Sequence, residues 1–199
     1  MTPTAMLKFA VEAIHVLSLA VDVADKFVDV LKNAGIVKNS SKSDELGAKV
    51  LRGREMGITP EKVETLKDYE EYARKIDEIE LPENQSYSLK EKQAAANEFI
   101  TGAMNMKYGQ NFGVNNFLAE VDGHSNFYSP ERINSYLDCA KQNNLNMENI
   151  GRYFDSKLDA MQDIRRTESV LVAAEKSIGV NEQDAKKKFE TERLHRAEK

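Results

Sequence analysis

The segment 5–31 constrains the fold of this chain more than any other part of the sequence. Nineteen of its 27 residues are Ala, Val, Leu, Ile, Met or Phe. A set of polar residues recurs at intervals of seven and so lies on one narrow stripe of a helix: Lys8, His15, Asp22 and Asp29. A helix that is apolar around most of its circumference must be buried on most sides. The sequence therefore predicts a central helix over residues 3–34, with the other helices packed around it.

Helical periodicity and helix-start signals continue along almost the whole chain. The motifs Thr59-Pro60-Glu61 and Ser129-Pro130-Glu131 each place a capping hydroxyl before a proline, and Ser88 with Glu91 forms a capping box. These signals predict helices over 44–56, 59–80, 88–108, 114–121, 129–142, 146–178 and 182–197. No period-two pattern is long enough to indicate a strand. We expect an all-α fold: an irregular bundle of six to eight helices in one domain, residues 1–179, followed by a charged helical extension, residues 180–199.

Composition and charge exclude several classes of protein. The chain has 199 residues and a net charge of −5, and its single cysteine, Cys139, cannot form an internal disulfide. A nucleic-acid-binding protein usually carries a basic excess, because contacts with phosphates supply much of its affinity. The basic run 186–188 has acidic neighbours and is typical of a solvated helix face. We therefore expect no nucleic-acid partner.

The N-terminal segment raises the question of a membrane. Its longest uncharged run, residues 13–21, is nine residues long, whereas a helix that spans a membrane needs about 20. Glu12 interrupts what would be the apolar core of a secretory signal. We expect a cytoplasmic protein without a membrane partner. The alternative, a membrane-active protein led by the first helix, is weakened by a polar stripe with four acids against two lysines, since interfacial helices favour Lys and Arg.

The segment from Tyr108 to Tyr128 is the least helical part of the sequence and is rich in Asn, Gly and aromatic residues. Segments of this kind between rigid helices often carry recognition, although they also serve as plain connections whose aromatic residues fill the core. From this segment we predict a set of partner-binding residues: Asn111, Phe112, Asn115, Asn116, Phe117, Asn126, Phe127 and Tyr128. Two further candidate docking surfaces are the acidic helix 60–80 and the C-terminal helix.

An acid/base cluster forms an alternative candidate site in the same segment. Glu120, Asp122 and His124 lie within five residues of one another, and a carboxylate beside an imidazole can act as general acid and base. Their spacing matches no metal or catalytic signature, and Asp122-Gly123 is also an ordinary turn. Under this alternative the protein is a hydrolase that uses these three residues as its catalytic group.

No cofactor or metal site is predicted from the sequence. The glycines at 47, 53 and 57 lack the Gly-Lys-Ser/Thr ending of a phosphate-binding loop, and one cysteine cannot build a paired-cysteine metal site. The absence of such motifs favours a protein without enzymatic activity that works by its shape. The sequence therefore predicts a helical protein that binds a macromolecular partner, most simply another protein, in the manner of an inhibitor, immunity-type or adaptor protein.

Overall fold

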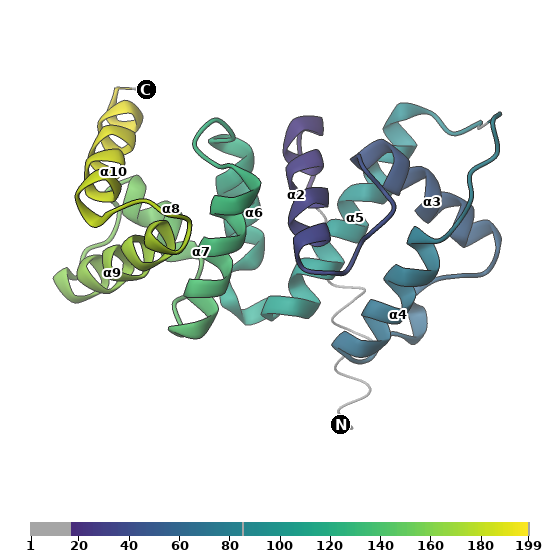
Figure 1. Ribbon diagram of the computed structural model, residues 1–199, viewed down its shortest axis with the longest axis horizontal. Coiled ribbons are helices and arrows are strands. Elements are labelled where there is room, and N and C mark those ends of the chain that lie inside the picture. Colours follow the sequence, from purple (N-terminus) through teal and green to yellow (C-terminus); the bar gives the residue numbers. More distant parts are fainter. Residues whose placement is uncertain (1–16, 85, 199) are drawn as a thin grey trace. The chain divides into compact units, whose positions relative to one another are not determined.

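The computed structural model describes residues 17–84 and 86–198, and all the regular secondary structure in these residues is helical (Figure 1). They form nine α-helices and two 3-10 turns, against the six to eight helices expected, and they contain no strand. The chain divides into two compact units, residues 1–107 and 108–199, a boundary that the sequence analysis did not place. The first unit contains α2 Val21–Asn33, α3 Ser43–Glu55, η1 Pro60–Lys62, α4 Leu66–Asp77 and α5 Leu89–Tyr108, of which the last residue belongs to the second unit. The second contains η2 Gln110–Phe112, α6 Val114–Gly123, α7 Pro130–Gln142, α8 Glu148–Phe154, α9 Met161–Ser177 and α10 Glu182–Ala197.

The helix predicted over residues 3–34 is shorter where the structure describes it. Residues 17–20 are not helical, Ala20 is extended, and α2 begins only at Val21. The carbonyl of Leu19 accepts hydrogen bonds from the side-chain amides of Gln93 and Asn97 at 3.4 and 3.5 Å, so it does not depend on a helical partner. Residues 3–16 of the predicted helix lie outside the described residues. The prediction that this helix is central to the fold depends on them.

Two glycines in α3 explain how the first unit packs closely. A Cβ atom at Gly47 would lie 1.8 Å from the carbonyl oxygen of Lys92 in α5, and one at Gly53 would lie 2.3 Å from the side chain of Ile76 in α4. Both glycines lower the intrinsic helix propensity of α3. The structure shows why they are there: each allows a neighbouring helix or side chain to approach the α3 backbone.

The helix predicted from Thr59 starts later than its sequence signal. Pro60–Lys62 forms only a 3-10 turn, and α4 begins after Thr65. Thr65 accepts a hydrogen bond from the backbone of Asp68 at 3.2 Å, and Asp68 accepts one in return from the backbone of Thr65 at 2.8 Å. This capping box satisfies two N-terminal donors of α4, which the Thr59 hydroxyl does not do.

The single helix predicted over residues 146–178 is broken into α8 and α9. Ser156 has a φ of 58°, in the left-handed region, and the backbone N–H of Lys157 returns to the carbonyl of Arg152 at 2.7 Å. This is a helix-terminating motif that glycine usually provides, and the sequence offers neither Gly nor Pro at this point. The Ser129 cap of α7 and the end of α9 before Gly179 are confirmed.

The C-terminal helix packs within its own unit. In Figure 1, α10 lies against α8 and α9, and contacts with both helices fix it there. Ala185 and Phe189 are buried, and the ring of Phe189 meets those of Tyr153 and Phe154 edge-on at 6.2 and 5.7 Å. Among the described residues, no helix combines the length and the hydropathy that crossing a membrane requires.

Candidate functional site

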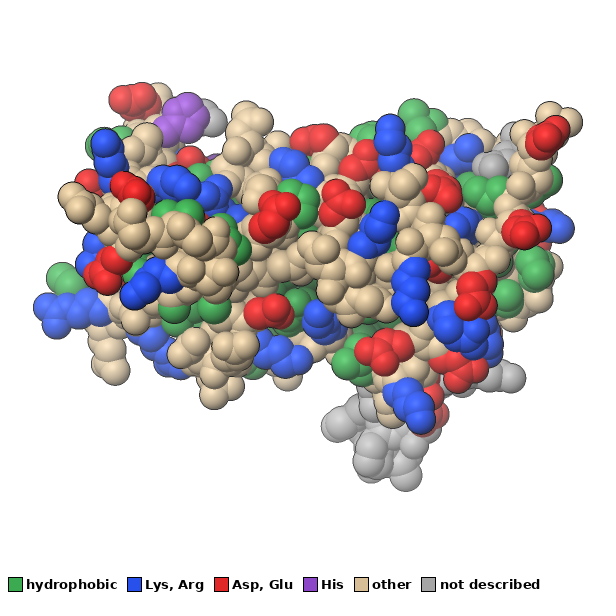
Figure 2. All heavy atoms as spheres, viewed as in Figure 1, with side chains coloured by type: hydrophobic (Ala, Val, Ile, Leu, Met, Phe, Trp, Pro, Cys, Tyr) green, Lys and Arg blue, Asp and Glu red, His purple; other side chains and the backbone are tan. Residues whose placement is uncertain are grey.

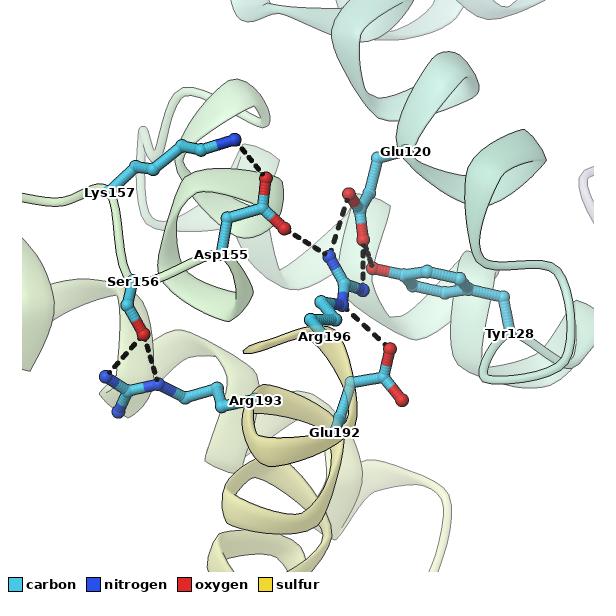
Figure 3. Close-up of polar contacts among 8 residues, drawn as sticks. All are labelled: Glu120, Tyr128, Asp155, Ser156, Lys157, Glu192, Arg193 and Arg196. Carbon is cyan, nitrogen blue, oxygen red and sulfur yellow. Dashed lines mark hydrogen bonds and ion pairs between the residues drawn. The ribbon is translucent and has the colours of Figure 1, made fainter. Parts of the chain in front are cut away.

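Glu120 is the centre of a buried polar cluster in the second unit (Figure 3). It extends from α6, which begins directly after Gly113, a residue with a φ of 72°. Its carboxylate accepts a hydrogen bond from the Tyr128 hydroxyl at 2.7 Å and one from Arg196 Nη2 at 2.6 Å. The carboxylate also lies against α8 at Gly151, where a Cβ atom would come within 2.8 Å of it. Glu120 is therefore held by three other elements: the turn before α7, α8 and α10.

Arg196 completes this cluster from the C-terminal helix. Besides Glu120, its guanidinium donates to Asp155 at 3.1 Å and to Glu192 at 2.8 Å, and it lies 5.0 Å from the centre of the Phe154 ring. Its side chain is 5 % exposed and that of Glu120 is 9 % exposed. Burial alone would lower the pKa of Arg196, but the hydrogen bonds and charge of Glu120 raise it overall. We call Glu120, Asp155, Glu192 and Arg196 the C-terminal clamp, because they join α10 to α6 and α8.

The predicted acid/base group has little freedom to act as one. The Glu120 carboxylate is occupied by Arg196 and Tyr128, and a general base needs an oxygen that can reach a substrate proton. Nδ1 of His124 is buried and has no hydrogen-bond partner. Burial lowers the pKa of His124, with Arg196 acting in the same direction and Glu120 against it. No group of three or more potential metal ligands occurs among the described residues. This geometry gives the hydrolase alternative no support.

A second buried ion cluster lies beside the first turn of α7. Glu175 of α9 is fully buried and accepts hydrogen bonds from Arg132 and from the Tyr136 hydroxyl. Arg132 also donates to the carbonyl of Phe127 and lies 4.8 Å from the centre of its ring. This cluster fixes the turn that carries Asn126 and Phe127, because Arg132 binds both the turn, at Phe127, and Glu175 of α9.

The turn, α7 and α10 line a shallow, open groove with a volume of about 690 Å³, which we call the α10 groove. Its lining residues are Asn126, Phe127, Arg132, Gly179, Val180, Asn181, Asp184, Lys187, Lys188, Thr191 and Glu192. Phe127 is half-buried there, and Asn126, Lys187 and Lys188 are exposed. The two fixed walls, one held by Arg132 and the other by Arg196, make this groove a defined recess in the second unit.

The predicted partner-binding residues are distributed over several environments. Phe117 and Tyr128 are fully buried in the core of the second unit and are not surface residues. Phe112 and Asn115 are half-buried, and Asn111 and Asn116 are exposed. Of the predicted set, Asn126 and Phe127 line the α10 groove. The structure thus brings two of the predicted residues together with the C-terminal helix, which the sequence analysis treated as a separate candidate surface.

Several residues of these sites were missed from the sequence. Arg196 lies one turn after Glu192 in α10, so a helical ion pair was visible, but its contact with Glu120 spans 76 residues. Arg132 and Glu175 are likewise 43 residues apart. The sequence signal for these pairs was at most a charged residue on an otherwise apolar helix face. Comparison with known proteins adds no assignment, since no protein-family model, curated protein or solved structure matches this chain.

Proposed function

We propose that this chain is a protein-binding module and that the α10 groove is its docking site. The observation that carries the proposal is the groove itself, a recess of 690 Å³ with Phe127 on one wall and exposed polar and charged side chains of α10 on the other. Binding sites are typically concave, with an apolar surface and a few polar groups that fix orientation. The α10 groove combines a small apolar part, Phe127 and Val180, with polar and charged side chains, and it includes two of the residues that the sequence nominated for recognition.

The rigidity of both walls also supports the proposal. Binding to a site with fixed walls costs less conformational entropy than binding to a site whose loops must first become ordered. On one side Arg132 ties the turn to Glu175, and on the other Arg196 ties α10 to Glu120. Both ion pairs therefore support the shape of the surface.

Site-specific photo-crosslinking tests this function. A benzophenone amino acid is placed at Asn126 or at Thr191, which line the groove from different elements. The matched controls are Glu190 and Gln162, both exposed and neither in the groove; Glu190 directly precedes Thr191 on α10. In extracts of the source cells, both groove positions should yield the same protein adduct and both controls should yield none. The absence of an adduct at both groove positions, or an equal adduct at all four, would contradict the proposal.

A further inference from the structure

We infer that the α10 groove recognises an acidic segment of a partner protein, and that Lys187 and Lys188 are the residues that read its charge. This inference rests on the proposed function, since it names the chemistry of the partner at the same groove. It begins from the three consecutive lysines of α10, residues 186–188, which the structure places in two different environments.

Lys186 lies outside the groove and is already paired with acids. Its ammonium lies 2.8 Å from Glu182 and 3.9 Å from Glu168, and it lines a separate depression between α9 and α10. Lys187 and Lys188 line the α10 groove instead. Lys188 has one distant contact, 3.9 Å from the buried Glu175, whose carboxylate is shared with Arg132. Lys187 and Lys188 thus present their ammonium groups to the groove with less compensation from neighbouring acids than Lys186 has.

The acids that line the groove do not cancel this charge. Glu192 is 13 % exposed and shares Arg196 with Glu120 and Asp155 in the C-terminal clamp, so its carboxylate points into the clamp and not to solvent. Asp184 accepts a hydrogen bond from the Asn181 side chain at 2.6 Å and lies in the first turn of α10. Partial positive charge at a helix N-terminus offsets an acid in that position. Of the exposed charged side chains that line the groove, two are lysines, Lys187 and Lys188, and one is an acid, Asp184. Carboxylates are the groups that would complement the two lysines.

The apolar part of the groove indicates a protein segment. Phe127 and Val180 are half-buried and line the recess, so an apolar side chain between two acidic residues would find contacts there. A nucleic acid fits less well, because phosphate binding relies on several cations spread along the backbone. Figure 2 shows basic and acidic side chains interspersed over the displayed face, without a continuous basic field.

Fluorescence anisotropy with the full-length protein tests the inference. The probes are three fluorescein-labelled 12-residue peptides that share their leucines and carry glutamate, glutamine or lysine at the remaining positions. At low salt, the glutamate peptide should bind about tenfold more tightly than the glutamine peptide, and the lysine peptide should not bind. Lys187→Gln with Lys188→Gln should remove most of the tenfold preference. Lys186→Gln, which changes the same residue type one position earlier, should alter affinity less than twofold.

Three results would overturn the inference: equal binding of the glutamate and glutamine peptides, an equal effect of Lys186→Gln, or displacement of the glutamate peptide by an equimolar 20-nucleotide single-stranded DNA. The last result would indicate that Lys187 and Lys188 bind nucleic acid and not an acidic protein segment. Failure here is distinguishable from failure of the proposed function. If Asn126 and Thr191 crosslink to one partner in both the wild type and the Lys187→Gln/Lys188→Gln variant, the docking site stands and the acidic specificity falls.

Discussion

Arg196 and Glu120 form a buried ion pair with a 2.6 Å contact, although 76 residues separate them in the sequence. The pair connects the last turn of α10 to α6, and Tyr128 donates a further hydrogen bond to the same carboxylate. Since α10 contributes only Ala185 and Phe189 to the core, its position depends strongly on these polar contacts. The α10 groove exists only while that helix is in place.

Removing the cation of the clamp should destabilise the second unit. Arg196→Met leaves the Glu120 carboxylate buried without its charged partner, and breaking a buried pair in this way costs about 3 kcal/mol. Urea denaturation followed by circular dichroism measures the effect. Arg165→Met is the control, because Arg165 is exposed on the neighbouring helix α9. Equal unfolding midpoints for the two variants would show that the clamp contributes nothing to stability.

The close approach of α3 and α5 makes Gly47 sensitive to the smallest substitution. Gly47→Ala places a Cβ atom 1.8 Å from a backbone carbonyl oxygen that cannot move independently. Overpacking of this kind costs about 1–3 kcal/mol or more, despite the higher helix propensity of Ala. Gly123→Ala is the comparison, because no atom lies within 4 Å of that Cβ position. Thermal melts should show a lower transition temperature for Gly47→Ala alone.

The carboxylate of Asp77 predicts a pH dependence for the first unit. It accepts hydrogen bonds from the backbone N–H groups of Lys38, Asn39 and Ser40, at 2.6 to 2.8 Å, and from the Ser40 hydroxyl at 2.7 Å. Burial by itself would raise the pKa of Asp77, but the hydrogen bonds lower it overall. Because the folded pKa lies below the unfolded value, this contribution is fully present above about pH 4 and is lost as the pH falls through the folded pKa.

Asp77→Asn should therefore cost about 2 kcal/mol of unfolding free energy at pH 6 and markedly less at pH 3. Urea titrations of the wild type and the variant at both pH values give the difference. Glu83→Gln, at an exposed position, should change stability by less than about 0.5 kcal/mol at either pH. A loss for Asp77→Asn that is the same at pH 3 and pH 6 would contradict the assigned role of the charge.

The single thiol should react slowly. Burial raises the pKa of Cys139, and the charge of Asp138 acts in the same direction, against a hydrogen bond with Ser135. The thiolate is the reactive form, so little of it is present at neutral pH. A disulfide reagent should label Cys139 more slowly at pH 7.5 than it labels a cysteine at the exposed position Asn126 in a Cys139→Ser background. Comparable rates would show that the thiol is not shielded.

Local signals in the sequence were sufficient for much of the fold. The cap at Ser129, the capping box at Ser88 and the stop at Gly179 involve residues close in sequence, and the structure confirms them. The break at Ser156 was not predictable in this way, because a serine in the left-handed region depends on its surroundings; its hydroxyl accepts hydrogen bonds from Arg193 at 3.0 and 3.2 Å. The late start of α4 shows a related difficulty, since two adjacent capping signals competed.

The candidate site was less predictable, because it is assembled by long-range pairs. Asn126 and Phe127 were nominated from composition alone, and the same reasoning nominated Phe117 and Tyr128, which fill the core. Alternation of apolar and polar residues cannot distinguish an aromatic residue that lines a groove from one that lies beneath it. The roles of Arg132 and Arg196 required knowledge of which helices meet, and no periodic pattern carries that information.

Hydrogen exchange of the α10 amides tests most directly whether this helix is a fixed wall of the groove. In the wild type, the amides of residues 186–192 should exchange about as slowly as those in the middle of α9, because packing and the clamp hold both helices. In Arg196→Met, the α10 amides should exchange faster than those of α9, which should speed up only as far as the loss of stability of the whole second unit requires. If residues 186–192 of the wild type exchange at the rate of an unstructured peptide, α10 is not a stable wall and the docking site does not exist.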